Sequence, residues 1–190
     1  MQSEGDPEAG HRLFYTREDI LRRIQLWKSR DRSTADLLSD YFLDAAWWNS
    51  WDFFDLMGRE PKVFDDWLAQ LPKLSFADRG DCIDREDWRR GLIEDFGRMG
   101  DNRAPKALRD RLVARLKSIQ VRQLEPGAKP RDWLAGGAVL YSKEDLRRMI
   151  PKWENRDGSG VSEISDYFCE FVAHNPQGFL EGMVGQKGFD

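Results

Sequence analysis

The sequence predicts an all-α protein built from two copies of a helix-pair module packed around a central helical insert. Three observations lead to this fold class. The chain of 190 residues repeats itself, its apolar residues recur at helical spacing within each copy, and no segment alternates apolar and polar residues long enough to require a sheet. Aromatic residues make up 12% of the chain and supply large side chains for a core, despite a mean hydropathy of -0.70.

The repeat aligns residues 15–57 with residues 141–183 without a gap, an offset of 126 positions (141 - 15). About fifteen of the roughly forty-three pairs are identical, which is far above chance. All four tyrosines of the protein fall into matched pairs. Matched positions are candidates for structural roles in the module. These candidates are Asp19, Trp27, Asp31, Asp40 and Tyr41 in the first copy, and Asp145, Trp153, Asp157, Asp166 and Tyr167 in the second.

The first helix of the module is predicted to follow Thr16. Its hydroxyl can cap free backbone amides, and Asp19 stands three residues later as in a capping box. Apolar residues then recur at helical spacing as Ile20, Ile24 and Trp27, and we expect the helix to end near residue 28. Ser142 and the residues after it repeat this pattern in the second copy.

Three further helices complete the first copy. A second apolar stripe over residues 37–46 predicts a helix that packs antiparallel to the first. Asn49 interrupts this stripe before a short third helix, and Pro61, well placed in a first helical turn, opens a fourth that contains Trp67. The second copy follows the same order but has no counterpart of Trp67, so we expect it to be either naturally trimmed or truncated.

Between the copies, residues 84–98 and 105–121 predict two more helices, and the Pro and Gly residues over 121–139 indicate a linker. The expected organisation is a mobile tail over residues 1–12, the first module over 13–70, the insert over 71–138, and the second module over 139–190.

In outline, the paired helices and a Phe-rich third helix at Phe53 and Phe54 resemble HEAT-like or armadillo-like helical repeat proteins. Those proteins serve mainly as binding surfaces, so the resemblance implies a binding role.

The sequence offers little for catalysis, and we predict no catalytic residue, cofactor or metal ligand. His11 lies in the predicted tail, and His174 replaces Trp48 of the first copy. No Gly-rich phosphate loop or metal-binding His pair is present. Residues 155–166 partly resemble a calcium-binding EF-hand loop, but departures at its ligand positions favour a Gly-relaxed helical turn.

Localisation follows from what the sequence lacks. Two cysteines, Cys82 and Cys169, are too few for a disulfide framework. No apolar run approaches the roughly 18 residues of a membrane helix, and the acidic N-terminus is unlike a signal peptide. We therefore expect a cytoplasmic protein without a membrane partner.

The segment Trp47–Phe54 is the most unusual in the chain. Its counterpart over residues 173–180 keeps only the Asn and one Phe, so the three tryptophans are additions that the module does not need in order to fold. They either pack against the insert or form a binding surface, and we expect at least one to be partly exposed. Asp52, Asp55, Asp65 and Asp66 would give this patch an acidic rim. The candidate partner-binding residues are Trp47, Trp48, Trp51, Asp52 and Asp55.

The insert has the opposite charge. Between residues 103 and 131, nine Lys or Arg face two acidic residues, a net of +7 (9 - 2), within a chain of net charge -4. Either this basic helix lies on the acidic modules of its own chain, or it attracts nucleic acid. The candidate nucleic-acid-binding residues are Arg109, Arg111, Arg115 and Lys117.

The sequence therefore predicts a non-enzymatic protein–protein interaction module. Acidic patches steer association with basic proteins, so a bacterial immunity or antitoxin-type protein that neutralises a basic partner fits this charge pattern. The alternative is a nucleic-acid-associated regulatory protein that binds through the basic helix over residues 103–122. A third hypothesis is an enzyme that uses carboxylates and arginines between the two copies.

Overall fold

A computed structural model describes residues 15–29, 34–80, 83–100, 105–127, 141–155 and 161–184. Over these ranges the protein is all-α, as predicted, and the only β pairing is an isolated bridge between Ala77 and Arg122. The predicted tail and most of the predicted linker lie outside the described residues, as do Asp31 and Asp157.

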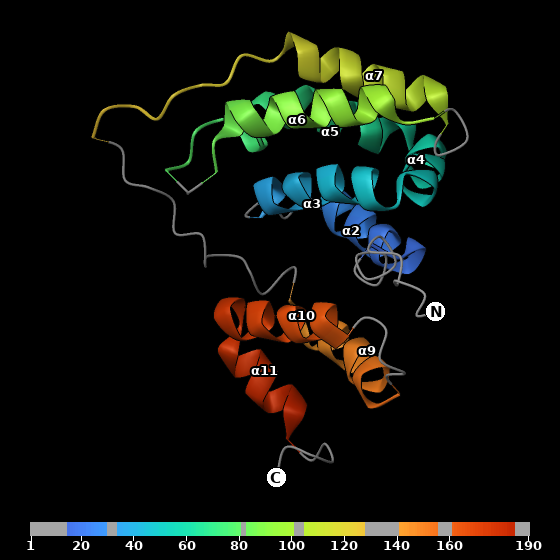
Figure 1. The fold of residues 1–190 in the computed structure, drawn as a ribbon, viewed down its shortest axis with the longest axis vertical. Coiled ribbons are helices and arrows are strands. Elements are labelled where there is room, and N and C mark those ends of the chain that lie inside the picture. Colours follow the sequence, from blue (N-terminus) through green and yellow to red (C-terminus); the bar gives the residue numbers. More distant parts are fainter. Residues whose placement is uncertain are drawn as a thin grey trace, which may run out of the picture. The chain divides into compact units, whose positions relative to one another are not determined.

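The chain divides into two compact units, of which the larger covers residues 14–131 and the smaller contains residues 132–190. The larger unit contains α2 (Arg17–Lys28), α3 (Ala35–Trp48), α4 (Ser50–Arg59), α5 (Pro61–Leu74), α6 (Arg85–Arg98) and α7 (Lys106–Ser118), and the smaller contains α9 (Lys143–Glu154), α10 (Val161–His174) and α11 (Pro176–Met183) (Figure 1).

The predicted caps form at the starts of α2 and α9. The backbone N–H of Asp19 donates to Thr16 Oγ1 at 3.2 Å, and the Asp19 carboxylate accepts from the Thr16 backbone N–H at 3.3 Å. Ser142 and Asp145 make the same reciprocal pair at 3.3 and 3.1 Å. Both aspartates are buried, and each cap satisfies helix-end amides that would otherwise lack partners.

Aromatic rings from three helices form the core of the larger unit. Phe42 of α3, Phe53 of α4 and Trp67 of α5 are fully buried, with centroid separations of 5.5 to 6.0 Å. Trp27 of α2 joins them 5.7 Å from Phe42, and its indole N–H donates to Asp66 at 3.0 Å. α5 therefore covers α3 and α4, while α6 and α7 lie side by side in Figure 1.

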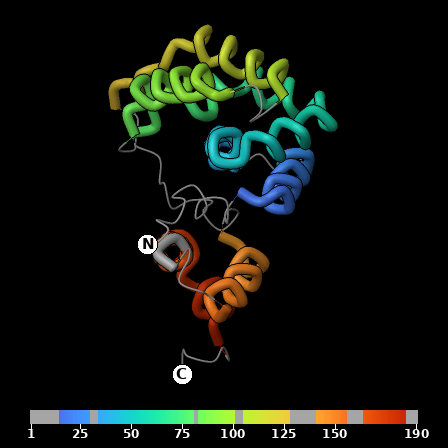
Figure 2. Tube along the Cα trace, turned by 45° about the vertical axis from the view of Figure 1, so that its right-hand side comes forward, coloured from blue at the N-terminus to red at the C-terminus, as the bar shows by residue number. Residues whose placement is uncertain are grey.

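In its described residues the smaller unit consists of α9, α10 and α11, drawn orange to red in Figure 2. Phe179 of α11 lies 5.8 Å from both Phe168 and Phe171 of α10, and Trp153 of α9 lies 5.8 Å from Phe168. Trp153 is half-buried, whereas Trp27 is buried.

Matched tyrosines make the same contact in both units. Tyr41 stacks at a tilt on Tyr15 with 5.2 Å between centroids, and Tyr167 lies 5.6 Å from Tyr141. These pairs join the segment before the first helix of each unit to the second helix. The matched aspartates differ, because Asp40 lies in a polar network described below and Asp166 is exposed on α10.

Candidate protein-binding surface

The candidate surface lies at the corner between α3 and α4, where a single residue separates the two helices. Asn49 leaves helical geometry with φ -136° and ψ 60°. Its side-chain N–H donates to the Tyr15 carbonyl at 2.8 Å and to Asp52 at 2.9 Å. Asn175 donates to the Tyr141 carbonyl at 3.0 Å in the smaller unit. The identical Asn thus fixes the corner in both units by the same long-range hydrogen bond.

The three added tryptophans occupy different environments at this corner. Trp47 is half-buried, with centroids 6.1 Å from Phe96 of α6 and 6.4 Å from Trp48. Trp48 is half-buried as well. Trp51, in the first turn of α4, is 58% exposed. Trp47 therefore packs against the predicted insert, and Trp51 fulfils the expectation that at least one of these indoles is exposed.

The acidic residues beside Trp51 already have cationic neighbours within the chain. Arg17 contacts Asp52 at 2.9 Å and Asp55 at 2.7 Å, and Arg59 contacts Asp55 at 3.0 Å. The hydrogen bond from Arg17 lowers the pKa of the Asp55 carboxyl. Asp52 and Asp55 are half-buried, whereas about two fifths of the Arg17 side chain is exposed.

One of these ion pairs belongs to the module and the other does not. At the matched positions Lys143 contacts Glu181, as Arg17 contacts Asp55. Asp52 is replaced by Gly178, whose backbone N–H donates to the Asn175 side chain at 3.0 Å. Asp52 is thus an addition of the first copy, like the three tryptophans. Residues 17 and 143 are both basic in the aligned segments, and this match is the sequence signal that indicates the repeated ion pair.

The other predicted rim residues also contact this chain. Asp65 pairs with Arg111 of α7 at 2.6 Å, and Asp66 accepts from the indole of Trp27. Each carboxylate of the predicted acidic rim therefore has an intrachain donor, because α2, α4 and α7 bring cations and an indole beside them.

Two of the predicted nucleic-acid-binding residues connect α7 to neighbouring segments. Arg109 is only 4% exposed and donates to the carbonyls of Met99 and Gly100 at 3.0 and 2.9 Å. Arg111 pairs with Asp65, and its guanidinium lies 5.2 Å from the Phe64 ring centroid.

Arg115 contacts α5 at a backbone carbonyl that Pro72 leaves without a helical donor. Proline has no backbone N–H, so the Leu68 carbonyl, four residues earlier in α5, loses its helical donor. Arg115 Nε donates to this carbonyl at 2.9 Å, and Nη2 donates to the Ala69 carbonyl at 3.2 Å. Lys117, the fourth predicted residue, is exposed on α7, and the interactions described include no contact of this kind for it. The contacts of the other three favour the internal role of the basic helix.

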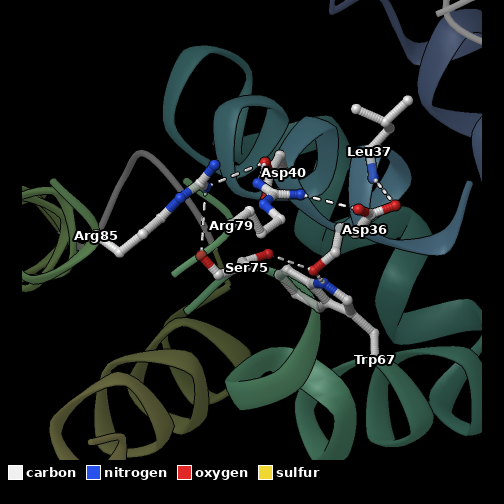
Figure 3. A network of polar contacts seen from close by, with 8 residues as sticks. Asp36, Leu37, Asp40, Trp67, Ser75, Arg79 and Arg85 are labelled. Carbon is white, nitrogen blue, oxygen red and sulfur yellow. Dashed lines mark hydrogen bonds and ion pairs between the residues drawn. The ribbon is translucent and has the colours of Figure 1, made fainter. Parts of the chain in front are cut away.

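A buried polar network joins α3 to the segment between α5 and α6 (Figure 3). Arg79 contacts Asp36 at 3.1 Å and also pairs with Asp40, and Arg85 contacts Asp40 at 3.2 Å. Burial raises the pKa of Asp40, and the two guanidinium groups oppose that rise. The sequence singled out Asp40 but neither arginine, because the partners lie 39 and 45 residues away.

Hydroxyl groups extend the network to α5. The Trp67 indole N–H donates to Ser39 Oγ at 2.9 Å, and Ser39 Oγ and Ser75 Oγ are 2.6 Å apart. Arg85 also donates to the Ser75 carbonyl at 3.3 Å. These contacts are buried and serve the packing of α5 and α6 on α3.

One carboxyl near the corner is perturbed strongly. Asp44 lies on α3 one turn after Asp40, and burial together with the Asp40 charge raises its pKa from 3.8 to about 7. A side-chain hydrogen bond with Tyr15 opposes this rise. Asp44 was not singled out from the sequence, because its burial depends on the packing of the whole unit.

The described residues contain no cluster of three or more His, Cys, Asp or Glu that could hold a metal ion. His174 is stacked on Tyr141 at 4.9 Å and lies 3.4 Å from Glu170, and His11 lies outside the described residues. Within the described ranges no helix has the length and apolar character needed to cross a membrane. Compared with protein families, curated proteins and solved structures, the chain has no match.

Proposed function

We propose that this chain is a non-enzymatic protein-interaction module that binds another protein through the surface around Trp51. The observation that carries the proposal is an indole that is 58% exposed at a position where the second copy has Gln177. Tryptophan is enriched among residues that dominate binding energy, since one side chain buries a large area with few rotatable bonds. Trp48 and Asp52, also additions of the first copy, extend this surface.

The helix that presents Trp51 is well anchored. Phe53, Phe54 and Met57 of α4 are fully buried, and Asn49 ties the helix start to the Tyr15 carbonyl. A preorganised helix loses little conformational entropy on binding, so more of the interaction energy is available for affinity. Two copies of a paired-helix module, in the manner of HEAT-like or armadillo-like proteins, would form the scaffold for this surface.

The charges beside Trp51 favour a basic partner. Exposed ion pairs contribute about 0–1 kcal/mol each, so a cation on a partner can replace Arg17 at Asp52 and Asp55 at little cost. Neutralisation of a basic protein, as by bacterial immunity or antitoxin-type proteins, fits this surface best.

The proposal predicts that Trp51→Ala abolishes capture of the partner from a lysate of the source organism, while leaving the urea unfolding midpoint unchanged. Leu21→Ala is the matched control, because Leu21 is an exposed apolar residue of α2 at 43%. We expect the control to retain the protein that the wild type captures. Equal retention by both variants would remove the Trp51 surface from consideration.

Nucleic-acid binding through the basic helix has weaker support, because Arg109, Arg111 and Arg115 contact their own chain. A gel shift with mixed DNA and RNA, repeated at rising salt, tests this alternative. Phosphate contacts weaken steeply with salt, so salt-sensitive binding that Lys117→Met reduces would favour it over the protein partner.

A further inference from the structure

Aligned positions on α3 and α4 of the larger unit and on α10 and α11 of the smaller unit differ sharply in burial. In the larger unit these positions of α3 and α4 are buried, and in the smaller unit their counterparts on α10 and α11 are exposed. The pairs, with the buried member first, are Ser39 and Ser165, Leu43 and Cys169, Ala46 and Val172, and Phe54 and Leu180. Val172 is 44% exposed and Leu180 is 67% exposed, so an apolar face of α10 and α11 is uncovered.

In the larger unit, a further helix covers the equivalent face. α5 lies over α3 and α4, its Phe64 ring is 6.5 Å from Phe54, and its Trp67 indole donates to Ser39 Oγ at 2.9 Å. α5 is an amphipathic helix whose buried residues follow helical spacing. Ser165 presents the same hydroxyl on α10.

We infer that the exposed face of α10 and α11 binds an amphipathic helix of a partner protein, in the position that α5 has on α3 and α4. This is helix-in-groove recognition, in which apolar residues at helical spacing enter the face and an indole reaches the Ser165 hydroxyl. The face is distinct in sequence from the Trp51 surface, so either proposal stands if the other fails.

The charged residues of α10 and α11 indicate which charge the partner helix carries. Residues 161–184 contain Glu163, Asp166, Glu170 and Glu181, and no Lys or Arg. Asp166 and Glu170 are exposed, and Lys143 of α9 pairs with Glu181. A partner helix with Lys or Arg beside its apolar stripe complements this rim, and complementary charge favours encounter and register.

The first arm of the test measures access to the face in the free protein. Cys169 is exposed on it, and Cys82→Ser leaves Cys169 as the sole cysteine of the 190-residue chain. We expect maleimide to react with Cys169 in native protein within about tenfold of its rate in urea, since an exposed thiol is readily attacked. Protection by about a hundredfold or more would mean that another part of this chain covers the face, and would overturn the inference.

The second arm uses a labelled peptide of residues 60–75 in which Asp65 and Asp66 are replaced by Lys. We expect it to bind the 190-residue chain by fluorescence anisotropy and to slow the maleimide reaction at Cys169. The double variant Val172→Gln, Leu180→Gln removes the apolar contacts without changing the charge of the face, and it should bind at least about tenfold more weakly while keeping its unfolding midpoint, because both residues are exposed.

Two controls separate this face from non-specific attraction. Leu21→Gln makes the same kind of change at an exposed apolar site elsewhere and should bind as the wild type does. The same peptide with Trp67→Ala should bind more weakly because it lacks the indole. Absence of peptide binding, or equal binding to the double variant, would contradict the inference.

Discussion

At the scale of single residues, the α3–α4 corner contains some positions that are identical in the two aligned segments and others that differ. Asn49 and Asn175 are identical and each donates to a carbonyl 34 residues earlier. Trp51 faces solvent where the second copy has the polar Gln177, which is exposed too. A position exposed in both copies can change without affecting the fold, and this freedom allows a binding residue to arise there.

Asp44 should make stability depend on pH. Its pKa is about 7 in the folded protein, against an ordinary value of 3.8, so the folded state holds the proton more tightly. The stabilisation from this proton is complete below about pH 4 and is lost as pH rises through 7. We predict that Asp44→Asn is more stable than wild type by about 4 kcal/mol at pH 8, and equally stable near pH 4.

Urea unfolding of both proteins at the two pH values measures this difference, and the titration of groups that do not interact with Asp44 cancels in the comparison. A difference that is the same at pH 4 and pH 8 would show that Asp44 does not titrate between them.

At the scale of helices, local signals were readable from the sequence and long-range ones were not. The α2 and α9 caps, the break at Asn49 and the start of α5 at Pro61 depend on residues within one turn, and each was predicted. The partners of Asp40 and the half-burial of Trp47 on Phe96 depend on segments some 40 to 50 residues away. No local pattern specifies such contacts, so the acidic rim was predicted without its cations.

The contact between α7 and α5 gives a prediction at this scale. Arg115→Met should lower the free energy of unfolding by about 1–3 kcal/mol, because the Leu68 carbonyl that Pro72 leaves without a helical donor would lose Arg115 Nε. Lys117→Met is the matched control two residues away on the same helix, and it should change stability by about 0.5 kcal/mol or less. Urea denaturation measures both, and equal effects would show that the guanidinium contacts are not stabilising.

At the scale of the molecule, the charge pattern and the aromatic surplus were readable from composition, but the contacts that these residues make were not. The basic stretch predicted to lie on acidic modules connects α7 to α5 and to residues 99–100 through arginine. Of the three added tryptophans, Trp47 packs inside the larger unit and Trp51 is exposed. The fold class followed from periodicity, whereas the burial of Trp47 and the exposure of Trp51 depend on how the helices pack.

The most direct test of the proposed function places a photocrosslinking benzophenone amino acid at residue 51 in the source organism. The benzophenone keeps an apolar aromatic group at this position, and residue 21 on α2 serves as the exposed control site. We predict a discrete protein adduct from position 51 that is absent from position 21, and that adding Asp52→Lys reduces it by charge repulsion. No adduct at position 51, or the same adduct from both sites, would contradict a binding role for this surface.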